Sequence, residues 1–219
     1  FQMGSDADNN EFNDFTSGAP AGWTTVNAAS STLTNSLYGF WRINATSAVT
    51  SWKYRKQMAA LNSSWNSFKY GPFFFRDGRW SGDVTYLFGV YADNAGAIDE
   101  NTFVRTNLTF DNVAGVWKVR GEKKNGTTQT NTAWFNLSQY PVAMPIWMRI
   151  VVNKGASNQT VRTYLGSSGI AASHTMMETA TVTYTWGNAL WAQVELLTRP
   201  ASGIDDYVYL GGLERDGSA

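Results

Sequence analysis

Hydrophobic and polar residues alternate along most of the chain, and this pattern predicts β-strands. In the stretch DVTYLFGVY, every second side chain from Val84 to Val90 is apolar and would point to one face of an extended strand. The opposite face of this stretch is also mostly apolar, which is typical of a strand covered on both sides. The same alternation recurs in three further stretches, which are 146–152, 159–165 and 189–197. In the last of these, Gln193 and Glu195 are expected to face outwards.

Turn-forming sequences separate these stretches. In KKNGTT, Asn125 and Gly126 tolerate the positive φ of a tight hairpin, so they predict a reversal between residues 115–121 and 131–137. Breaks of this kind recur roughly every dozen residues, the spacing expected of a sandwich or barrel. The segment 53–68 has apolar residues at helical spacing, but its NSSWNS sequence is poor helix material. We interpret it as strand, loop and strand, with a short helical turn as the alternative.

These elements predict an all-β protein, built as an antiparallel β-sandwich. A single domain is expected to span residues 6–219, because no interior linker, repeat or change of composition interrupts the pattern. Residues 1–5, FQMGS, are interpreted as the remnant of an expression tag and play no part in the expected fold.

The amino-acid composition excludes several classes of binding partner. The chain has 17 basic and 17 acidic residues, so it lacks the basic excess expected of a protein that binds nucleic acid or an anionic membrane. It has no cysteine, which excludes disulfides and thiolate metal sites. No apolar run approaches the roughly 20 residues needed to span a bilayer, so no membrane insertion is expected. Its Ser-, Thr-, Asn- and Gly-rich polarity is typical of proteins outside the cell or on a virion surface.

Four segments follow one another in an order that invites comparison with a known fold. They are NDFTSGAPAGWTTVN, FKYGPFFFRDGRWSGDVTYLFGVY, WMRIVVNKGASNQTVRTYLGSSG and GIDDYVYLGGLE. In that order they resemble the opening strand and turn, the paired central strands, the late hairpin and the final strand of concanavalin A-like lectin and glucanase jelly rolls. The resemblance implies a concanavalin A-like jelly roll, found in carbohydrate-binding modules, in glycan hydrolases and lyases, and on virus particles.

Catalytic residues of the kind that the resemblance implies are not evident. Glucanases of this fold carry paired carboxylates on one strand, because an acid and a nucleophile or base must flank the scissile bond. No strand here offers such a pair, and Glu195 stands alone on its strand. The sole histidine, His174, lies beside an expected loop and is interpreted as a bystander, since a general base also needs an orienting partner. We therefore expect no enzymatic activity.

The polar segment RDGRWSGD supplies the first candidate contacts for a sugar. Trp80 is a candidate stacking platform, with Arg79 and Asp77 as partners for hydroxyl groups. Trp186 with the nearby Asn188 is a second candidate. The alternative is that RDGRWSGD is only a turn between strands. Other tryptophans are expected to pack in the interior, and these include Trp23, Trp117 and Trp147.

Two polar clusters have weaker functional interpretations. Asp93, Asn94 and Asp99 offer hard oxygen ligands and are the candidates for a Ca²⁺ site, although a solvated turn explains them as well. No other cofactor is expected. A basic cluster is interpreted as a solvated sheet edge, with an anionic glycan as the less favoured alternative. Its residues are Lys118, Arg120, Lys123 and Lys124.

The function expected from the sequence is that of a non-catalytic, surface-exposed, lectin-like domain that adheres to glycans on a cell or particle surface. A phage or other virion surface, decoration or tail protein is the favoured setting. Contacts with other virion proteins and formation of a homo-oligomer are left open. The alternative is a secreted carbohydrate-binding module or a polysaccharide-degrading enzyme domain of the same fold class.

Overall fold

Regular structure in the described part of the chain consists of β-strands. The computed structural model describes residues 11–14, 22–26, 33–35, 41–44, 52–58, 65–75, 82–137, 146–153, 159–166, 175–182, 189–198, 207–210 and 212–216. No helix occurs among these residues, and none of them therefore forms a helical segment able to cross a membrane.

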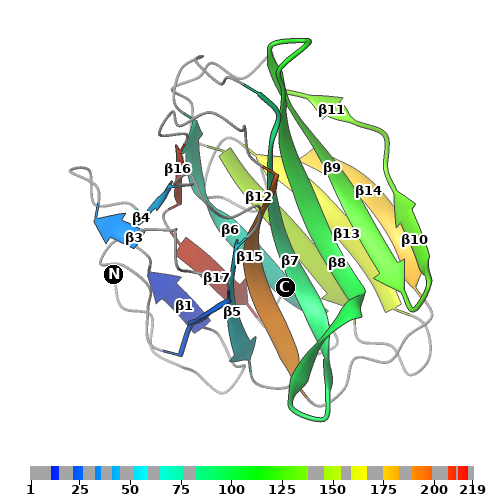
Figure 1. The fold of residues 1–219 in the computed structure, drawn as a ribbon. Coiled ribbons are helices and arrows are strands. Elements are labelled where there is room, and N and C mark those ends of the chain that lie inside the picture. Colours follow the sequence, from blue (N-terminus) through cyan, green and yellow to red (C-terminus); the bar gives the residue numbers. More distant parts are fainter. Residues whose placement is uncertain are drawn as a thin grey trace.

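The described strands form two antiparallel sheets (Figure 1). The nine-stranded sheet contains β1 (Glu11–Asp14), β3 (Leu33–Asn35), β4 (Trp41–Asn44), β6 (Trp65–Phe75), β12 (Ile146–Asn153), β13 (Gln159–Gly166), β14 (Thr175–Val182), β16 (Tyr207–Leu210) and β17 (Gly212–Asp216). Its order is β14-β13-β12-β6-β16-β4-β3, with β17 also beside β6 and β1 beside β17.

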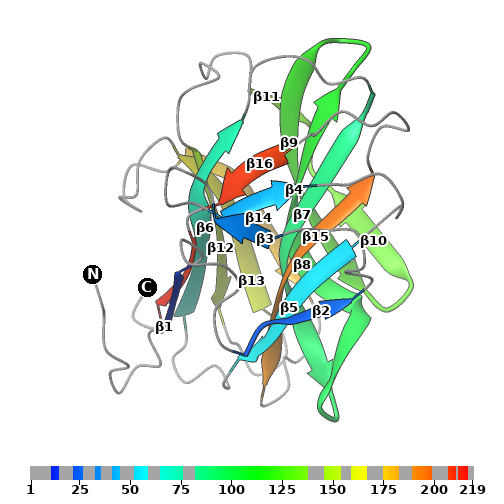
Figure 2. The ribbon, with the colours of Figure 1, turned by 60° about the vertical axis from the view of Figure 1, so that its left-hand side comes forward.

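The eight-stranded sheet contains β2 (Thr24–Val26), β5 (Trp52–Met58), β7 (Val84–Asn94), β8 (Ala97–Asp111), β9 (Val116–Asn125), β10 (Thr128–Asn131), β11 (Phe135–Asn136) and β15 (Leu190–Thr198). Its order is β10-β9-β8-β7-β15-β5-β2, with β11 also beside β9. Figure 2 shows the sheets as two layers, with β6 and β12 in one and β7, β15 and β5 in the other. The predicted antiparallel β-sandwich is confirmed.

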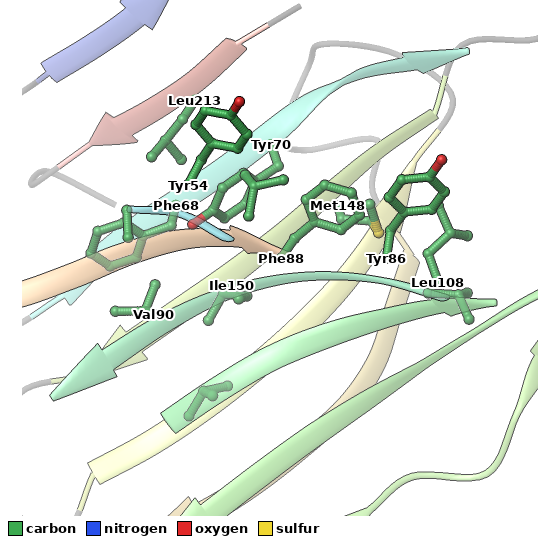
Figure 3. Close-up of a cluster of buried hydrophobic side chains, with 14 of the residues drawn as sticks. Tyr54, Phe68, Tyr70, Tyr86, Phe88, Val90, Leu108, Met148, Ile150 and Leu213 are labelled. Carbon is green, nitrogen blue, oxygen red and sulfur yellow. The ribbon is translucent and has the colours of Figure 1, made fainter. Parts of the chain in front are cut away.

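One hydrophobic core fills the space between the layers. Figure 3 shows Tyr70 and Met148 of the nine-stranded sheet facing Tyr86 and Phe88 of the eight-stranded sheet. All four side chains have 0% exposure, and the rings of Tyr70 and Phe88 lie 5.8 Å apart. Burying each such side chain stabilises the fold by about 1.5–3 kcal/mol, so this layer of aromatic and aliphatic groups holds the two sheets together.

Alternation along the strands gave the inward-facing residues correctly. Every second residue of β7 from Val84 to Val90 is fully buried in the core, and the intervening residues are buried as well, as a strand covered on both faces requires. The inward residues expected of β12 and β15 are also in the core. Gln193 and Glu195 do lie on the opposite face of β15, but they are buried at 0% and 4% exposure instead of solvated.

The expected pairing of the central strands is wrong. β6 and β7 belong to different sheets and face each other across the core, where the Tyr70 hydroxyl donates a 2.7 Å hydrogen bond to the Gly89 carbonyl oxygen. An apolar strand has the same sequence pattern whether its partner lies beside it or opposite it, so the pattern alone did not separate these arrangements. Residues 76–81, which connect the two strands, lie outside the described residues.

The hairpin predicted at KKNGTT is present, one residue further along than expected. Asn125 pairs with Thr128, so Gly126 and Thr127 are the two central residues of the turn. Gly126 has φ of 60°, which fits the first central position of a type II′ turn. Strands β5 and β6 confirm the extended ends expected for 53–68, while residues 59–64 lie outside the described part.

The three tryptophans expected to pack do so in different places. Trp23 belongs to the core, and Trp117 packs against its edge. Trp147 lies on the far side of the nine-stranded sheet, where a Cβ added at Gly71 would be 2.5 Å from its Cδ1 atom. The indole therefore packs directly on the backbone of β6.

Ala95 is a strained position whose replacement should stabilise the protein. Asn94 pairs with Ala97, so Ala95 and Gly96 are the central residues of a type I′ turn, with φ of 53° and 88°. Since alanine disfavours positive φ, Ala95→Gly should raise the free energy of unfolding by up to about 1 kcal/mol and the melting temperature by about 2–4 °C.

Calorimetry on a matched variant checks this. Ala114 lies in the turn between β8 and β9 without a positive φ. Ala114→Gly should therefore lower the melting temperature, because glycine only adds freedom to the unfolded chain there. A loss of stability in both variants would contradict the assignment of strain to Ala95.

Candidate functional site

The face of the eight-stranded sheet that points away from the core, here called the outer face, gathers polar and charged side chains. They come from alternate positions of five neighbouring strands. One cross-strand row consists of Arg55, Gln193, Gly89, Arg105 and Glu122. The next row consists of Lys53, Glu195, Leu87, Asn107 and Arg120. Antiparallel pairing thus brings residues distant in sequence into contact on one surface.

Glu122 is the centre of the first group of contacts. Its Oε2 atom accepts a hydrogen bond from Arg105 Nε at 2.8 Å. Its Oε1 atom accepts hydrogen bonds from Asn107 Nδ2 at 2.8 Å and from Arg120 Nε and Nη2 at 2.9 and 2.7 Å. Burial alone would raise the pKa of Glu122, but the charge of Arg105 and these hydrogen bonds outweigh it and hold that pKa below its ordinary value.

Arg105 is held over the middle of the sheet by a close approach to β7. A Cβ added at Gly89 would lie 2.6 Å from the Arg105 Cβ atom, so only glycine leaves room for this arginine. The guanidinium lies 4.1 Å from the centroid of the Phe103 ring, and its Nη1 atom donates a 3.3 Å hydrogen bond to the Tyr91 hydroxyl. Burial raises the pKa of the Tyr91 phenol, which therefore stays protonated beside the arginine.

Lys53 joins two carboxylates in the second group of contacts. Its Nζ atom lies 2.8 Å from Glu100 Oε1 and 3.9 Å from Glu195 Oε2. Gln193 Nε2 donates a 3.2 Å hydrogen bond to the same Glu195 oxygen. Burial raises the pKa of Glu195, and the charges of Lys53 and Arg105 offset part of that effect. Glu195 is thus a buried carboxyl group already engaged by its neighbours.

Trp134 is an exposed aromatic residue on the outer face. At 39% exposure it is the one aromatic residue among the exposed large hydrophobic residues of the described chain. Lys118 Nζ lies 4.8 Å and Arg120 Cζ 4.3 Å from the centroid of its ring. Lys118 also pairs with Asp111 Oδ2 at 2.8 Å. An exposed indole beside fixed hydrogen-bond donors is an arrangement suited to a flat polar ligand.

The calcium candidates are engaged in the hairpin between β7 and β8. Asp93 Oδ1 accepts 2.8 Å hydrogen bonds from Gln57 Nε2 and Trp191 Nε1, and its Oδ2 accepts one of 2.9 Å from the Gly96 amide. The Gly96 bond is the main cause of a pKa for Asp93 below its ordinary value.

Asp99 Oδ1 accepts a 2.9 Å hydrogen bond from the Asn101 amide, and Asn94 is exposed. No group of three or more His, Asp or Glu residues in the described segments could hold a metal ion. The Ca²⁺ site stays a prediction.

The sugar contacts predicted from the sequence lie elsewhere in the chain. Asp77, Arg79, Trp80, Trp186 and Asn188 are outside the described residues, so those assignments stay predictions. Sequence reasoning missed Trp134 and the Glu122 contacts. The available signal was the alternation in KVRGE, which places three charged residues on one face of a strand, and the adjacent Trp134-Phe135 pair, of which one residue must face outwards.

Sequence comparison identifies no relative. No protein-family model matches the chain. No curated protein matches it by sequence similarity either.

Solved structures, by contrast, match the fold. The legume lectin-like domain from Entamoeba histolytica has a TM-score of 0.55 at 9% identity, covering 89% of this chain and 89% of its own. The carbohydrate recognition domain of Emp46p has a TM-score of 0.56 at 11% identity, covering 90% of this chain and 89% of its own. The VIP36 exoplasmic/lumenal domain, bound to Ca²⁺ and Man2, has a TM-score of 0.52 at 11% identity, covering 96% of this chain and 88% of its own. The chain has the concanavalin A-like lectin fold.

A glycoside hydrolase also contains this fold. A GH43 enzyme engineered for endo-xylanase and exo-arabinofuranosidase activity has a TM-score of 0.63 at 10% identity, covering 99% of this chain. The match spans 41% of the enzyme's length. At such low identity these likenesses define the fold and leave the activity open.

Proposed function

We propose that this protein is a non-catalytic lectin-like domain that binds glycans through the outer face of its eight-stranded sheet. The observation that carries the proposal is the exposed Trp134 indole beside the hydrogen-bonded side chains of Arg120, Glu122 and Asn107. Sugars present apolar C–H faces that stack on aromatic rings, and hydroxyl groups that pair with such polar groups. The lectins and carbohydrate recognition domain that share the fold support this proposal.

The absence of catalysis is part of the proposal, and the engagement of the described carboxylates supports it. Glycosidases hold two carboxyl groups about 5–9.5 Å apart across the scissile bond. Glu100 and Glu195 come near such an arrangement because both approach Lys53. However, the Glu195 side chain is only 5% exposed and its Oε2 atom already accepts a hydrogen bond from Gln193. A general acid must reach the leaving oxygen, and this carboxyl group is closed off from it.

The setting of the domain is proposed from composition. We place it outside the cell or on a virion surface, where glycans of a cell or particle are the partners. The neutral charge and cysteine-free, Asn- and Thr-rich sequence support this setting. A secreted carbohydrate-binding module would have the same binding activity in another setting. Copurification with virions from the native source distinguishes a virion protein from a secreted module.

A glycan array probed with the purified chain tests the proposed function. We expect saturable binding to a subset of oligosaccharides and no release of reducing ends from the matching polysaccharides. Gly89→Val should reduce that binding, because a side chain at this position displaces Arg105 from the outer face. An array without any saturable signal contradicts the binding function, and release of reducing ends that Glu195→Gln abolishes contradicts the non-catalytic part.

A further inference from the structure

The segment that carries Trp134 is fixed to its neighbour strand on both sides. The Thr132 amide donates a 2.9 Å hydrogen bond to the Gly121 carbonyl oxygen, and the Gly121 amide donates one of 3.0 Å to Thr132 Oγ1. On the other side Phe135 pairs with Val119 and packs against the core. Trp134 is therefore presented rigidly, and a ligand that stacks on it does not have to immobilise a loop first.

Two cationic side chains of β9, Lys118 and Arg120, contact the Trp134 indole. Antiparallel register with Phe135 opposite Val119 puts Trp134 beside Arg120, with Lys118 next along the same face. Both cationic groups lie within 5 Å of the ring centroid, at 4.8 and 4.3 Å. Trp134 nevertheless keeps 39% exposure beside these two side chains.

The two cations beside Trp134 are each held by a carboxylate. Lys118 pairs with Asp111, and Arg120 shares Glu122 with Arg105. Among the described residues, Lys118 Nζ donates to Asp111, and Arg120 donates to Glu122 through Nε and Nη2, so Lys118 Nζ and Arg120 Nη1 keep N–H groups for a ligand. The remaining donors of two cationic side chains beside a stacking surface favour an anionic ligand, because a charge-assisted hydrogen bond is stronger than a neutral one.

From this juxtaposition we infer that Trp134, Lys118 and Arg120 form a subsite for an acidic glycan, one whose pyranose rings carry carboxylate groups. The ring of the sugar stacks on the exposed part of the Trp134 indole, and its carboxylate accepts hydrogen bonds from Lys118 and Arg120. The planar guanidinium matches a carboxylate better than it matches a neutral hydroxyl group. The inference rests on the proposed function and specifies its class of ligand. It also reverses the sequence-based preference for a merely solvated basic edge.

Titration calorimetry with oligogalacturonate and its carboxyl-reduced, neutral counterpart tests the inference. The wild-type chain should bind the acidic form at least about tenfold more tightly, and the preference should shrink as salt rises from about 0.05 to about 0.5 M, because screening shortens the reach of the charges. Trp134→Ala and Lys118→Gln should each weaken binding of the acidic form about tenfold. Arg120 is left intact, because its removal would also disturb the buried Glu122.

Lys124→Gln is the matched control. Lys124 lies on the same strand and loses the same charge, but its Nζ atom donates to Asn101 Oδ1 at the hairpin and does not approach Trp134. Binding in this variant should change less than about twofold if the subsite is local, as expected for a distant solvated charge. All variants should melt close to the wild type, since the replaced side chains lie on the surface.

The outcomes separate the subsite from the function. Equal affinity for the acidic and reduced forms, or an equal loss in Lys124→Gln and Lys118→Gln, overturns the acidic subsite. Binding of the acidic form that Trp134→Ala leaves unchanged also overturns it and removes Trp134 from the proposed surface, while glycan binding by the chain stands. Absence of binding to every glycan on the array overturns both.

Discussion

Replacing Glu122 by alanine should lower the free energy of unfolding by about 3–5 kcal/mol, because the change leaves two arginines and an asparagine of the outer face without their shared acceptor. Glu122 is 2% exposed, and Arg105, Asn107 and Arg120 all donate to it. For a domain of this size, such a loss corresponds to a melting temperature lower by about 6–20 °C. Urea unfolding followed by tryptophan fluorescence measures it.

Glu100→Ala is the control for this prediction. Glu100 is also paired with a cation, Lys53 at 2.8 Å, but its side chain is 40% exposed, so the loss should stay below about 1 kcal/mol. The pH dependence gives an independent check. Because the folded-state pKa of Glu122 is held down, its contribution is present above the unfolded-state pKa and is lost as pH falls through the lower folded-state value. Equal losses in the two variants would show that burial of Glu122 has no special role.

Phe88→Ala should destabilise the sandwich by about 3–5 kcal/mol, since it empties the centre of the core. The Phe88 ring is fully buried and contacts the rings of Tyr70 and Tyr86, with centroids 5.8 and 6.5 Å away (Figure 3). These partners are anchored in two different sheets, so they cannot both move into the space. Thermal and urea unfolding should report the loss, with little change in circular dichroism of the remaining folded fraction.

Two control variants show how large the stability loss of Phe88→Ala is by comparison. Phe88→Leu keeps much of the buried carbon and should lose clearly less stability than Phe88→Ala. Val113, in the turn between β8 and β9, is 97% exposed, and Val113→Ala should change stability by no more than about 0.5 kcal/mol. If Phe88→Ala were as mild as Val113→Ala, the two sheets would not be held together by this layer of the core.

The fold was predictable because buried positions on a strand are apolar, so apolar and polar residues alternate in the sequence. The inward positions of β7, β12 and β15 all followed from a period of two, since successive side chains of a strand point to opposite faces. This alternation does not reveal which strand lies beside which. β6 and β7 follow each other in sequence, yet they lie in opposite layers, and nothing local distinguishes that arrangement from a hairpin.

The outer face was harder to predict for a related reason. Gln193 and Glu195 alternate with apolar residues as solvated positions do, but cross-strand neighbours bury them. The contact between Arg105 and Glu122 joins residues 17 positions apart, and it depends on a register that the turn between β8 and β9 sets. The basic cluster was visible in the sequence. Its relation to Trp134 was not, because it requires the chain to return beside β9 after β10.

The pairing of β1 with β17 has a consequence for how the domain can be joined to others. Glu11 lies opposite Arg215, so the two outermost strands in sequence are direct neighbours (Figure 1). They belong to the nine-stranded layer, whereas Trp134 and the outer face belong to the other layer. A linker fused at either strand would therefore be attached in the layer opposite the proposed glycan surface. Copies strung in tandem, or a permuted chain with β1 and β17 connected, would keep that surface open, and weak single contacts would then add up to avid attachment.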